Sequence, residues 1–486
     1  MHIEPNAFTF LALLVVWPAV AVYLFSRLPV PEAIIWTILG GFLLLPALAE
    51  IKIPMIPGID KASVPNVAAL LGCAMAAGRM PRIFRGFGLA EFLILVLIFS
   101  PVVTGMLNGD PIPVLSPDTG RLVDELPAVG AYDGFSAAIA KFVFTIPFFL
   151  GRHFLRRPED NAQVLRALAI AGMGYAVLML FEIKMSPQLH TWVYGYLPTP
   201  FFQQIREGGG FRPVVFLGKG VLVAFFGMTT IVAAAAFWRT GTRILRWRPD
   251  GAVAFLSVTV LLCKTVSAIL YAAVTVPLVR WARPRTQLRV ALLLATIACA
   301  YPLVRSADLV PTETMLSMAR TVSAQRSESL GVRFMWEHEL LRHALERPWF
   351  GWGRYGRNRV YTGYDGRDVS ITDGTWIIDI GMFGLVGFLA EFGLLWLAVF
   401  RAAGALKFVR NGPEAVYLGA LALIVAINMV DLLPNSSLSA WTWLLAGGLL
   451  GRAEALRAAA RLGAPRDVRL APARLQGAPT TTTAAT

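Results

Sequence analysis

Long apolar segments recur along most of this 486-residue chain. A helix needs about 20 consecutive apolar residues to cross the hydrocarbon core of a bilayer, and many of these segments come close to that length. Hydrophobic residues make up 56% of the chain and charged residues only 15%, whereas soluble domains carry about 25% charged residues. The sequence therefore predicts an all-α polytopic membrane protein with about 12–13 transmembrane helices.

Thirteen segments qualify as membrane spans. They are 8–26, 32–49, 64–79, 88–107, 135–151, 163–183, 214–237, 251–263, 266–280, 288–304, 380–401, 415–432 and 437–452. Thirteen crossings place the N-terminus outside, whereas twelve, with one early segment lying in the interface, place it inside. The opening "MHIEPN" lacks the Lys or Arg of a signal-peptide n-region, so we expect the first span to be retained.

Short arginine-rich loops separate several spans, and such loops mark the cytoplasmic side. Examples are "GRHFLRR" (151–157) and "FWRTGTRILRWR" (237–248). The segments 108–134, 184–213 and 305–375 then fall outside. The stretch 251–280 lies between two basic loops, so it must form a short hairpin whose tip faces outward. Lys264, in the tip "CKTVS", is thereby predicted near the outer surface.

The chain then divides into four regions. Residues 1–304 hold the N-terminal spans with the hairpin, 305–375 form a large outer loop, and 376–455 hold the C-terminal spans. The Ala/Pro/Thr-rich tail, 456–486, is expected to be disordered in the cytoplasm. The net charge of +14 does not indicate nucleic-acid binding, because the basic residues cluster in loops that flank spans. The three cysteines have neither disulfide nor metal-site spacing.

The large outer loop is unusual because its cations are all arginines. It holds ten Arg, no Lys and nine Asp or Glu, and arginine outside runs against the positive-inside tendency. Mutual ion pairing is one explanation, and the other is phosphate recognition by the planar guanidinium fork. Within the loop, 331–347 fits an amphipathic helix, with Arg333 and Glu337 as an i,i+4 pair. Pro348 ends this helix, and "GWGRYG" (351–356) supplies a flexible turn.

Other candidate residues stand at the ends of spans. Arg212 is either a snorkelling anchor or a ligand-binding cation. Lys219, two turns further on, is expected to face a cavity or a partner, for which Glu391 and Asp431 are candidates. Asp373, in "TDG", is either an ordinary turn residue or a site carboxylate.

Four motifs in order resemble the superfamily of bacterial O-antigen ligases and O-antigen polymerases. "FRPVVFLGKGVLVAFF" (211–226) resembles the arginine-containing start of a central span, and "LLCKTVSAILYA" (261–272) a short span with a basic "SRG"-like signature. "RFMWEHELLRHALERPWFGWG" (333–353) resembles the loop motif R…W……P..G.G, and "DGTWIIDIGMFGLVGFLAEFG" (373–393) the segment HN……E.G..G. Together the motifs cover roughly residues 205–400.

The resemblance implies a glycosyltransferase of the bacterial inner membrane with its active site facing the periplasm. Its donor is a glycan on undecaprenyl pyrophosphate, and its acceptor is another lipid-linked glycan or the lipid A core. Arg212, Arg333 and Lys264 map to pyrophosphate binding, and Arg333 and Asp373 to catalysis. Trp336, Trp352 and Trp376 are the expected glycan-binding side chains. We expect no metal or other cofactor and no nucleic acid, with membrane lipids and a chain-length regulator protein as further partners.

One departure from the family pattern affects the choice between its two activities. Ligases carry a histidine, thought to act as the base, where this chain has Asp373. An exposed carboxylate is a weak base unless burial raises its pKa. The substitution favours a polymerase of exopolysaccharide, capsule or O-antigen over a ligase. His338 and His343, on the predicted amphipathic helix, are alternative bases.

Two other classes of protein remain open. A flippase for lipid-linked oligosaccharides, or a polysaccharide transporter, would place ionisable residues deep in several spans and would show internal repeats. A structural or assembly factor would tolerate loss of Arg212, Arg333 and Asp373 individually.

Overall fold

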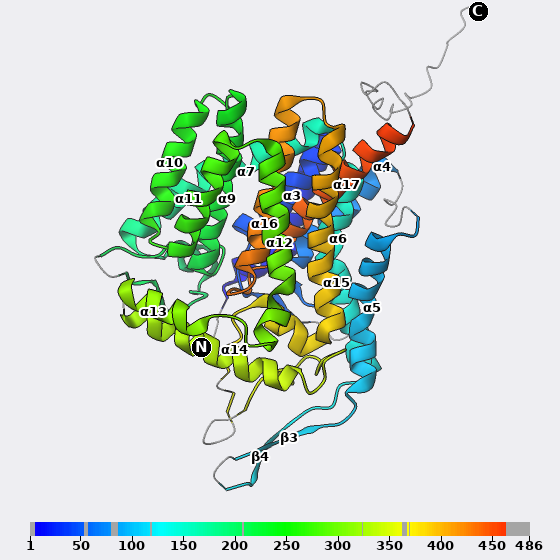
Figure 1. Cartoon of the computed structure of the whole chain (residues 1–486), viewed down its shortest axis with the longest axis vertical. Coiled ribbons are helices and arrows are strands. Elements are labelled where there is room, and N and C mark those ends of the chain that lie inside the picture. Colours follow the sequence, from blue (N-terminus) through cyan, green and yellow to red (C-terminus); the bar gives the residue numbers. More distant parts are fainter. Residues whose placement is uncertain are drawn as a thin grey trace, which may run out of the picture.

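The computed structural model describes residues 5–52, 57–78, 86–116, 119–206, 209–322, 324–361, 367–368 and 370–462. Within this part, eight helices are long and apolar enough to cross a membrane, and they pack side by side with shorter apolar helices (Figure 1). The chain is therefore an all-α multi-pass membrane protein, as its composition predicts. Two small β-hairpins are the sheet elements of the described residues.

All thirteen predicted spans coincide with helices. The long ones are α1–α2 (Ala7–Arg27, with a π-helical turn at Ala12–Val16), α5 (Leu89–Leu107), α6 (Ala131–Phe154), α7 (Pro158–Met185), α9 (Gly220–Thr240), α12 (Pro284–Ser306), α15 (Thr375–Ala405) and α16 (Gly412–Asp431). The others are α3 (Val30–Leu44), α4 (Ser63–Ala77), α10 (Pro249–Leu262), α11 (Val266–Trp281) and α17 (Ala440–Arg461), the last with several charged residues in its second half.

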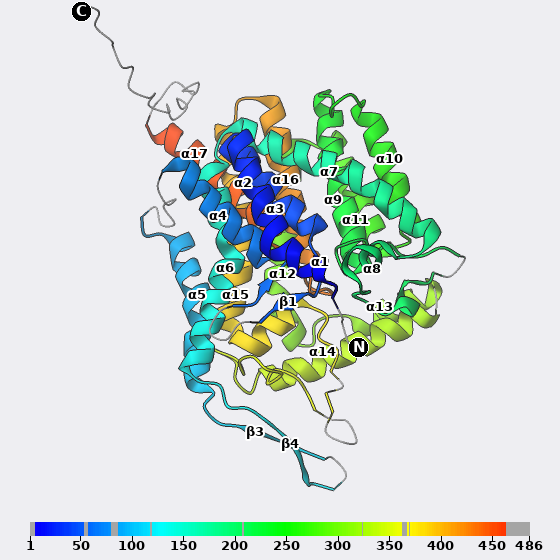
Figure 2. The same cartoon turned by 180° about the vertical axis from the view of Figure 1, so that it is seen from behind.

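Most of the remaining elements gather at one end of the bundle, which we call the loop end. They are α8 (Leu189–Tyr194), α13 (Thr312–Val322), α14 (Ala324–Ala344) and the hairpins β1–β2 (Glu50–Ile51, Ile59–Asp60) and β3–β4 (Ile112–Leu115, Leu122–Leu126). The turns between α6 and α7, α9 and α10, and α15 and α16 lie at the opposite end (Figures 1 and 2). This grouping matches the division into outer and cytoplasmic segments expected from the basic loops.

The first helix begins at the loop end and the last helix ends at the other. The side-chain amide of Asn6 donates to the Val193 carbonyl at 2.9 Å, which ties the start of α1 to α8. The C-terminal half of α17 lies at the opposite end (Figure 2). An odd number of crossings, as in the thirteen-span alternative, produces this arrangement.

Small residues let the central helices approach closely. A Cβ added at Gly447 of α17 would lie 2.1 Å from the Phe148 carbonyl oxygen of α6, so only glycine fits at this crossing. Between membrane helices there is little hydrophobic driving force, because lipid tails are as apolar as Leu, and such close van der Waals packing holds the bundle together. Alanines 233–236 of α9 are fully buried for the same reason.

Helix α15 is interrupted near its start. Gly384 has φ +68° and ψ −172°, which no right-handed helix contains, so the helix consists of two pieces joined at this residue. Residues 348–353, which we call the inserted loop, pack into the break. A Cβ at Gly384 would lie 2.2 Å from the carbonyl carbon of Trp349, so the close approach requires glycine.

The inserted loop takes up backbone groups that the interruption frees. Backbone hydrogen bonds join Leu385 N to Pro348 O at 2.7 Å, Val386 N to Trp349 O at 3.2 Å, Trp352 N to Gly381 O at 2.8 Å and Gly353 N to Met382 O at 2.9 Å. Irregular backbone inside a membrane domain persists only where such groups find partners in protein. The "GWGRYG" segment, predicted as a flexible turn, is instead fixed against α15 over its first half.

Several predicted boundaries were wrong. The amphipathic helix 331–347 is part of α14, which begins at Ala324 and ends at Ala344, before Pro348. The span predicted to begin at 214 begins at Gly220, because Gly218 adopts φ +82° and the chain turns there. The tail predicted from 456 is helical to Arg461 in α17, and residues 463–486 lie outside the described residues.

Candidate functional site

Two sequence-predicted residues form an ion pair at the loop end. Arg333 of α14 and Asp373, which immediately precedes the N-cap of α15, have their Nε and Oδ2 atoms 3.1 Å apart. Their side chains are 42% and 43% exposed, so both are accessible from outside the protein. The i,i+4 pair expected between Arg333 and Glu337 does not form, because Glu337 turns toward Arg305, with the Nε to Oε2 distance at 4.0 Å.

Arg212 lies close to this pair although it comes from another segment. Burial, together with the positive charges of Arg206 and Arg333, lowers the pKa of Arg212 to about 10. Its Nε is buried and has no hydrogen-bond partner among the described residues. The group therefore remains charged at neutral pH and faces other cations, an arrangement that favours an anion.

The position of Arg212 is set by a buried carboxylate that the sequence reasoning did not consider. After Pro213 the chain turns sharply, and the amides of Val214 and Val215 both donate to Oε2 of Glu182 at 2.8 Å. The backbone N–H of Arg212 donates to the Gln204 carbonyl at 2.7 Å. Glu182 thus fixes the strained turn, where Val215 has φ +45°, and with it the direction of Arg212.

Lys264 lies at the tip of the α10–α11 hairpin, as predicted, and adopts φ +51°. Its amine donates to the Gly209 carbonyl at 2.8 Å, in the segment that leads to Arg212. The hairpin tip is therefore at the loop end, level with the outer segments. We call Arg206, Arg212, Arg333 and Asp373 the arginine cluster, and Lys264 borders it.

The three predicted glycan-binding tryptophans differ in exposure. Trp376 is fully buried and packs edge-to-face on Tyr301 at 5.2 Å between ring centroids. Trp352 is buried, stacks on His343 at 4.4 Å and lies beneath the Arg347 guanidinium. The rings of both are covered by protein, so neither presents a face to a sugar in this structure. Trp336, on α14, is partly exposed.

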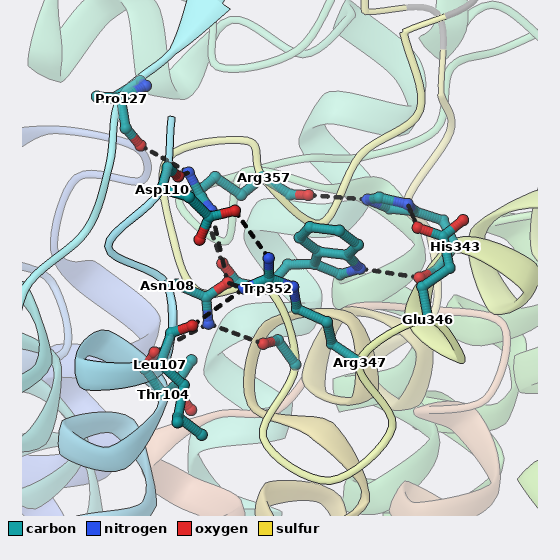
Figure 3. A network of polar contacts seen from close by, with 11 residues as sticks. Thr104, Leu107, Asn108, Asp110, Pro127, His343, Glu346, Arg347, Trp352 and Arg357 are labelled. Carbon is teal, nitrogen blue, oxygen red and sulfur yellow. Dashed lines mark hydrogen bonds and ion pairs between the residues drawn. The ribbon is translucent and has the colours of Figure 1, made fainter. Parts of the chain in front are cut away.

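Two arginines of the large loop form a structural network rather than a ligand site. Arg357 is fully buried and donates to the backbone carbonyls of Trp352, Asp110 and Pro127 at 2.8–3.0 Å (Figure 3). Arg347 binds Asp110 at 2.8 Å, and although burial opposes it, this hydrogen bond lowers the pKa of Asp110. The network ties the inserted loop to the base of the β3–β4 hairpin, and mutual pairing explains these two arginines.

The two alternative bases also have defined surroundings. His343 Nε2 lies 3.0 Å from the Arg357 carbonyl oxygen, and its ring stacks on Trp352, so it belongs to the same network (Figure 3). His338 is exposed on α14. Neither lies in the ion pair that joins α14 to α15.

A buried group of three ionisable side chains was not predicted. The amine of Lys141 lies between Asp379, at 3.4 Å, and Glu391, with which it forms a short ion pair. Lys141 is ten residues beyond the start of α6, about 15 Å along the helix axis. Asp379 and Glu391 lie on opposite sides of the break at Gly384, so the lysine joins the two pieces of α15. The sequence feature that could have revealed this group is Lys141 itself, because a lysine inside an apolar span usually faces a partner or a cavity.

Two contiguous cavities lead to this group. The inner one, of about 370 Å³, is lined by Lys141, Asp379 and Phe383. The outer one, of about 540 Å³, reaches Tyr132 and Thr372. Ala140, Arg354 and Met382 are among the residues that line both. Thr372, the residue that precedes Asp373, lines the outer cavity, so this cavity and the arginine cluster are one residue apart along the chain.

Lys219 has neither of the partners suggested from the sequence. It caps the start of α9 and donates to the Ser436 hydroxyl at 3.1 Å. Glu391 belongs to the group with Lys141, and Asp431 accepts hydrogen bonds from Asn435 at 3.0 Å and Ser437 at 2.8 Å. Lys219 therefore takes part in joining α9 to the loop after α16.

The chain matches no protein-family model. A search of curated proteins likewise finds no match to its sequence.

Proposed function

We propose that this protein is a membrane glycosyltransferase that polymerises oligosaccharide repeat units carried on undecaprenyl pyrophosphate, at the periplasmic face of the inner membrane and without a metal. The observation that carries the proposal is the arginine cluster. Arg212 and Arg333 come from segments more than one hundred residues apart in sequence, yet the charge of Arg333 helps to lower the pKa of Arg212, and Asp373 pairs with Arg333. Guanidinium groups gathered in this way suit a diphosphate.

The proposed chemistry is displacement at the anomeric carbon of the donor. The acceptor hydroxyl forms the new C–O bond while its proton passes to the Asp373 carboxylate. The bond between the anomeric carbon and the phosphate oxygen breaks, and undecaprenyl pyrophosphate leaves with the electron pair. Cations of the arginine cluster stabilise the negative charge that develops on the leaving diphosphate.

The Arg333–Asp373 pair suggests that the donor binds before the acceptor reacts. In the structure the carboxylate accepts from the guanidinium at 3.1 Å. A diphosphate is the stronger competitor for the same donors, because it offers more charge and more acceptor oxygens. Donor binding would therefore free Asp373 to act on the acceptor. A carboxylate in place of the ligases' histidine is the reason for preferring polymerisation to ligation onto lipid A core.

Reconstitution tests the proposal. The purified protein is incubated with the lipid-linked repeat unit in excess EDTA, and the products are separated by size. We expect a ladder of longer glycans, abolished by Arg333→Ala and strongly reduced by Asp373→Asn, whereas Arg342→Ala, which removes an exposed arginine of the same helix, leaves it intact. A ladder that requires Mg²⁺, or that survives both substitutions in the cluster, contradicts the mechanism. Transfer to lipid A core instead identifies a ligase.

Sidedness is tested separately by labelling a cysteine at position 333 in intact cells. The proposal requires that a membrane-impermeant maleimide added outside the inner membrane modify it. Two of the native cysteines are buried and the third is partly buried, which limits background labelling. Modification only from the cytoplasm would remove the basis of the proposal.

A transporter of lipid-linked oligosaccharide is the second candidate, and two observations favour it. Interrupted helices and ionisable residues within spans are typical of secondary transporters, and this protein has both in α15 and in the group around Lys141. A transporter would move the lipid-linked repeat unit across proteoliposomes without lengthening it. Product size in the reconstitution above separates the two functions.

A further inference from the structure

We propose that the two contiguous cavities bind the sugar part of the acceptor, with Asp379 and Lys141 at the inner end, an inference that rests on the proposed glycosyltransferase function. Nothing in the four sequence motifs assigns a ligand to this space. The cavities lie among α4, α6, α15 and the turn after the inserted loop, and they are contiguous because they share part of their lining.

The inner end holds a polar atom that lacks a hydrogen-bond partner among the described residues. Asp379 is 5% exposed, and its Oδ1 accepts from Lys141 at 3.4 Å. Its Oδ2 is buried and has no hydrogen-bond partner among the described residues. A buried polar atom without a partner is costly, so a hydrogen-bond donor from a ligand would find a prepared acceptor here.

The balance of charge in the lining argues for a hydroxyl-rich ligand and against an anion. Three carboxylates and four cations line the two cavities, so the charges nearly cancel, in contrast to the arginine cluster. The hydroxyls of Tyr132, Ser136 and Thr372 add both donors and acceptors in the outer cavity. Ile378, Met382 and Phe383 provide apolar surface for the C–H faces of a sugar ring. A saccharide combines these two kinds of surface.

The position of the cavities relative to the arginine cluster fits a reaction between two substrates. Thr372 lines the outer cavity, and Asp373, its neighbour in the chain, pairs with Arg333. A donor diphosphate on the Arg333 side and an acceptor sugar on the Thr372 side would therefore meet at Asp373. The acceptor's reacting hydroxyl lies at the mouth, and the rest of its sugar extends toward Asp379.

Blocking the shared part of the cavities tests the inference. Ala140 lines both, so Ala140→Trp fills the passage, whereas Ile139→Trp places the same side chain at the adjacent, exposed position of α6. The probe is the free repeat-unit oligosaccharide, released by mild acid from the lipid-linked intermediate of the producing cell. Binding to the full-length protein in nanodiscs is measured by saturation-transfer NMR and calorimetry.

We expect binding to the wild type and to Ile139→Trp, and at least tenfold weaker binding to Ala140→Trp and Asp379→Asn. Thermal unfolding of each variant shows whether it is folded, and Ala140→Trp leaves the Lys141 ion pairs chemically intact if Asp379→Asn fails to fold. Wild-type affinity in a folded Ala140→Trp, or absence of binding to the wild type, overturns the inference.

The same variants separate this inference from the proposed function. Sugar binding that Ala140→Trp abolishes, in a protein that makes no glycan ladder, supports the cavity site and refutes the enzyme. A ladder made at the wild-type rate by Ala140→Trp supports the enzyme and refutes the cavity as its acceptor site. Arg333→Ala should keep its affinity for the free oligosaccharide, because Arg333 does not line either cavity.

Discussion

Arg333 and Asp373 lie 3.1 Å apart, and this contact joins α14 to the residue before the N-cap of α15. The pair connects α14 of the large outer loop to the start of α15, and Thr372, the residue before Asp373, lines the outer cavity. Because both side chains are about two-fifths exposed, the pair itself contributes little to stability, in the range typical of surface ion pairs. Its importance in our proposal is functional: the carboxylate occupies guanidinium donors that a diphosphate would take.

Competition of this kind predicts opposite effects of one substitution on binding and on catalysis. Asp373→Asn removes the competing charge, so undecaprenyl pyrophosphate should bind several-fold more tightly while glycan elongation slows. The measurements are calorimetric affinity and the rate of ladder formation. Glu339→Gln, which makes the same charge change on α14, should alter neither. Weaker diphosphate binding by Asp373→Asn would contradict the competition.

Removing Lys141 should destabilise the membrane domain. Lys141→Met leaves Asp379 and Glu391 buried without their cation, and breaking a buried pair in this way costs about 3–5 kcal/mol. The triple variant Lys141→Met/Asp379→Asn/Glu391→Gln removes all three charges and should recover most of that loss. Thermal unfolding in detergent measures both. A triple variant no more stable than the single one would show that the lysine acts through packing alone.

Glycine at position 384 should be irreplaceable. Gly384→Ala imposes a Cβ 2.2 Å from the Trp349 carbonyl carbon and a positive φ, at a cost of about 3 kcal/mol or more. Gly393→Ala, on the same helix, meets only side-chain atoms at 3.7 Å and should be neutral or stabilise by about 0.5–1 kcal/mol. Limited proteolysis of the outer loop and the unfolding temperature report the difference. Equal stability of the two variants would mean that the inserted loop adapts freely.

The Arg357 network predicts a structural phenotype for an arginine in a motif-bearing loop. Arg357→Met deprives three backbone carbonyls of their donor and should cost about 3 kcal/mol, with loss of order in the β3–β4 hairpin. Arg320→Met, at an exposed position of α13, is the matched control and should change neither the stability nor the hydrogen exchange. Hydrogen exchange over 108–130 measures the loosening. Unchanged protection there would assign Arg357 a role other than anchoring.

His190 predicts a dependence of stability on pH. Burial, together with the charge of Lys61, lowers the pKa of His190 to about 4, although the hydrogen bond to the Tyr196 carbonyl opposes the shift. The ring also accepts from the Ala47 amide, as only the neutral form can. In the unfolded chain the ring takes up a proton near pH 6.5. Its contribution is therefore complete above about pH 6.5 and falls by about 3 kcal/mol as the pH drops to about 4.

The measurement is the unfolding temperature at several pH values for the wild type and His190→Gln. In His190→Gln the unfolding temperature should fall less as the pH drops. His338→Gln, at an exposed position, should keep the wild-type dependence on pH. A wild-type slope in His190→Gln would assign the acid sensitivity to other groups.

Sequence patterns were sufficient for the helices and singled out Arg212, Arg333 and Asp373, but not Arg206, of the arginine cluster. Apolar length fixes where helices lie, and the short hairpin followed from two basic loops that had to share a side. Arg333 and Asp373 stood out as charged residues in segments placed together by topology. Their direct pairing could not be predicted, because it depends on how α14 crosses the start of α15.

The features that were missed depend on contacts between distant segments. Nothing local distinguishes Gly384 from the other glycines of "GMFGLVGFLAEFG", and its positive φ exists because the inserted loop approaches there. From the sequence, Asp379 belongs to the start of a span, and only the structure shows that Lys141 lies beside it. In the sequence, Trp376 is an aromatic residue of a motif in an outer segment. Only its packing against Tyr301 shows that it belongs to the hydrophobic core.

The insertion of residues 348–353 into α15 also constrains biosynthesis. The loop emerges from the ribosome before the helix that supplies four of its backbone partners. It must therefore wait outside the membrane until α15 has been integrated, and only then can its final shape form. Expressed alone, residues 305–375 would lack those partners, so the large loop cannot be studied as a detached soluble domain.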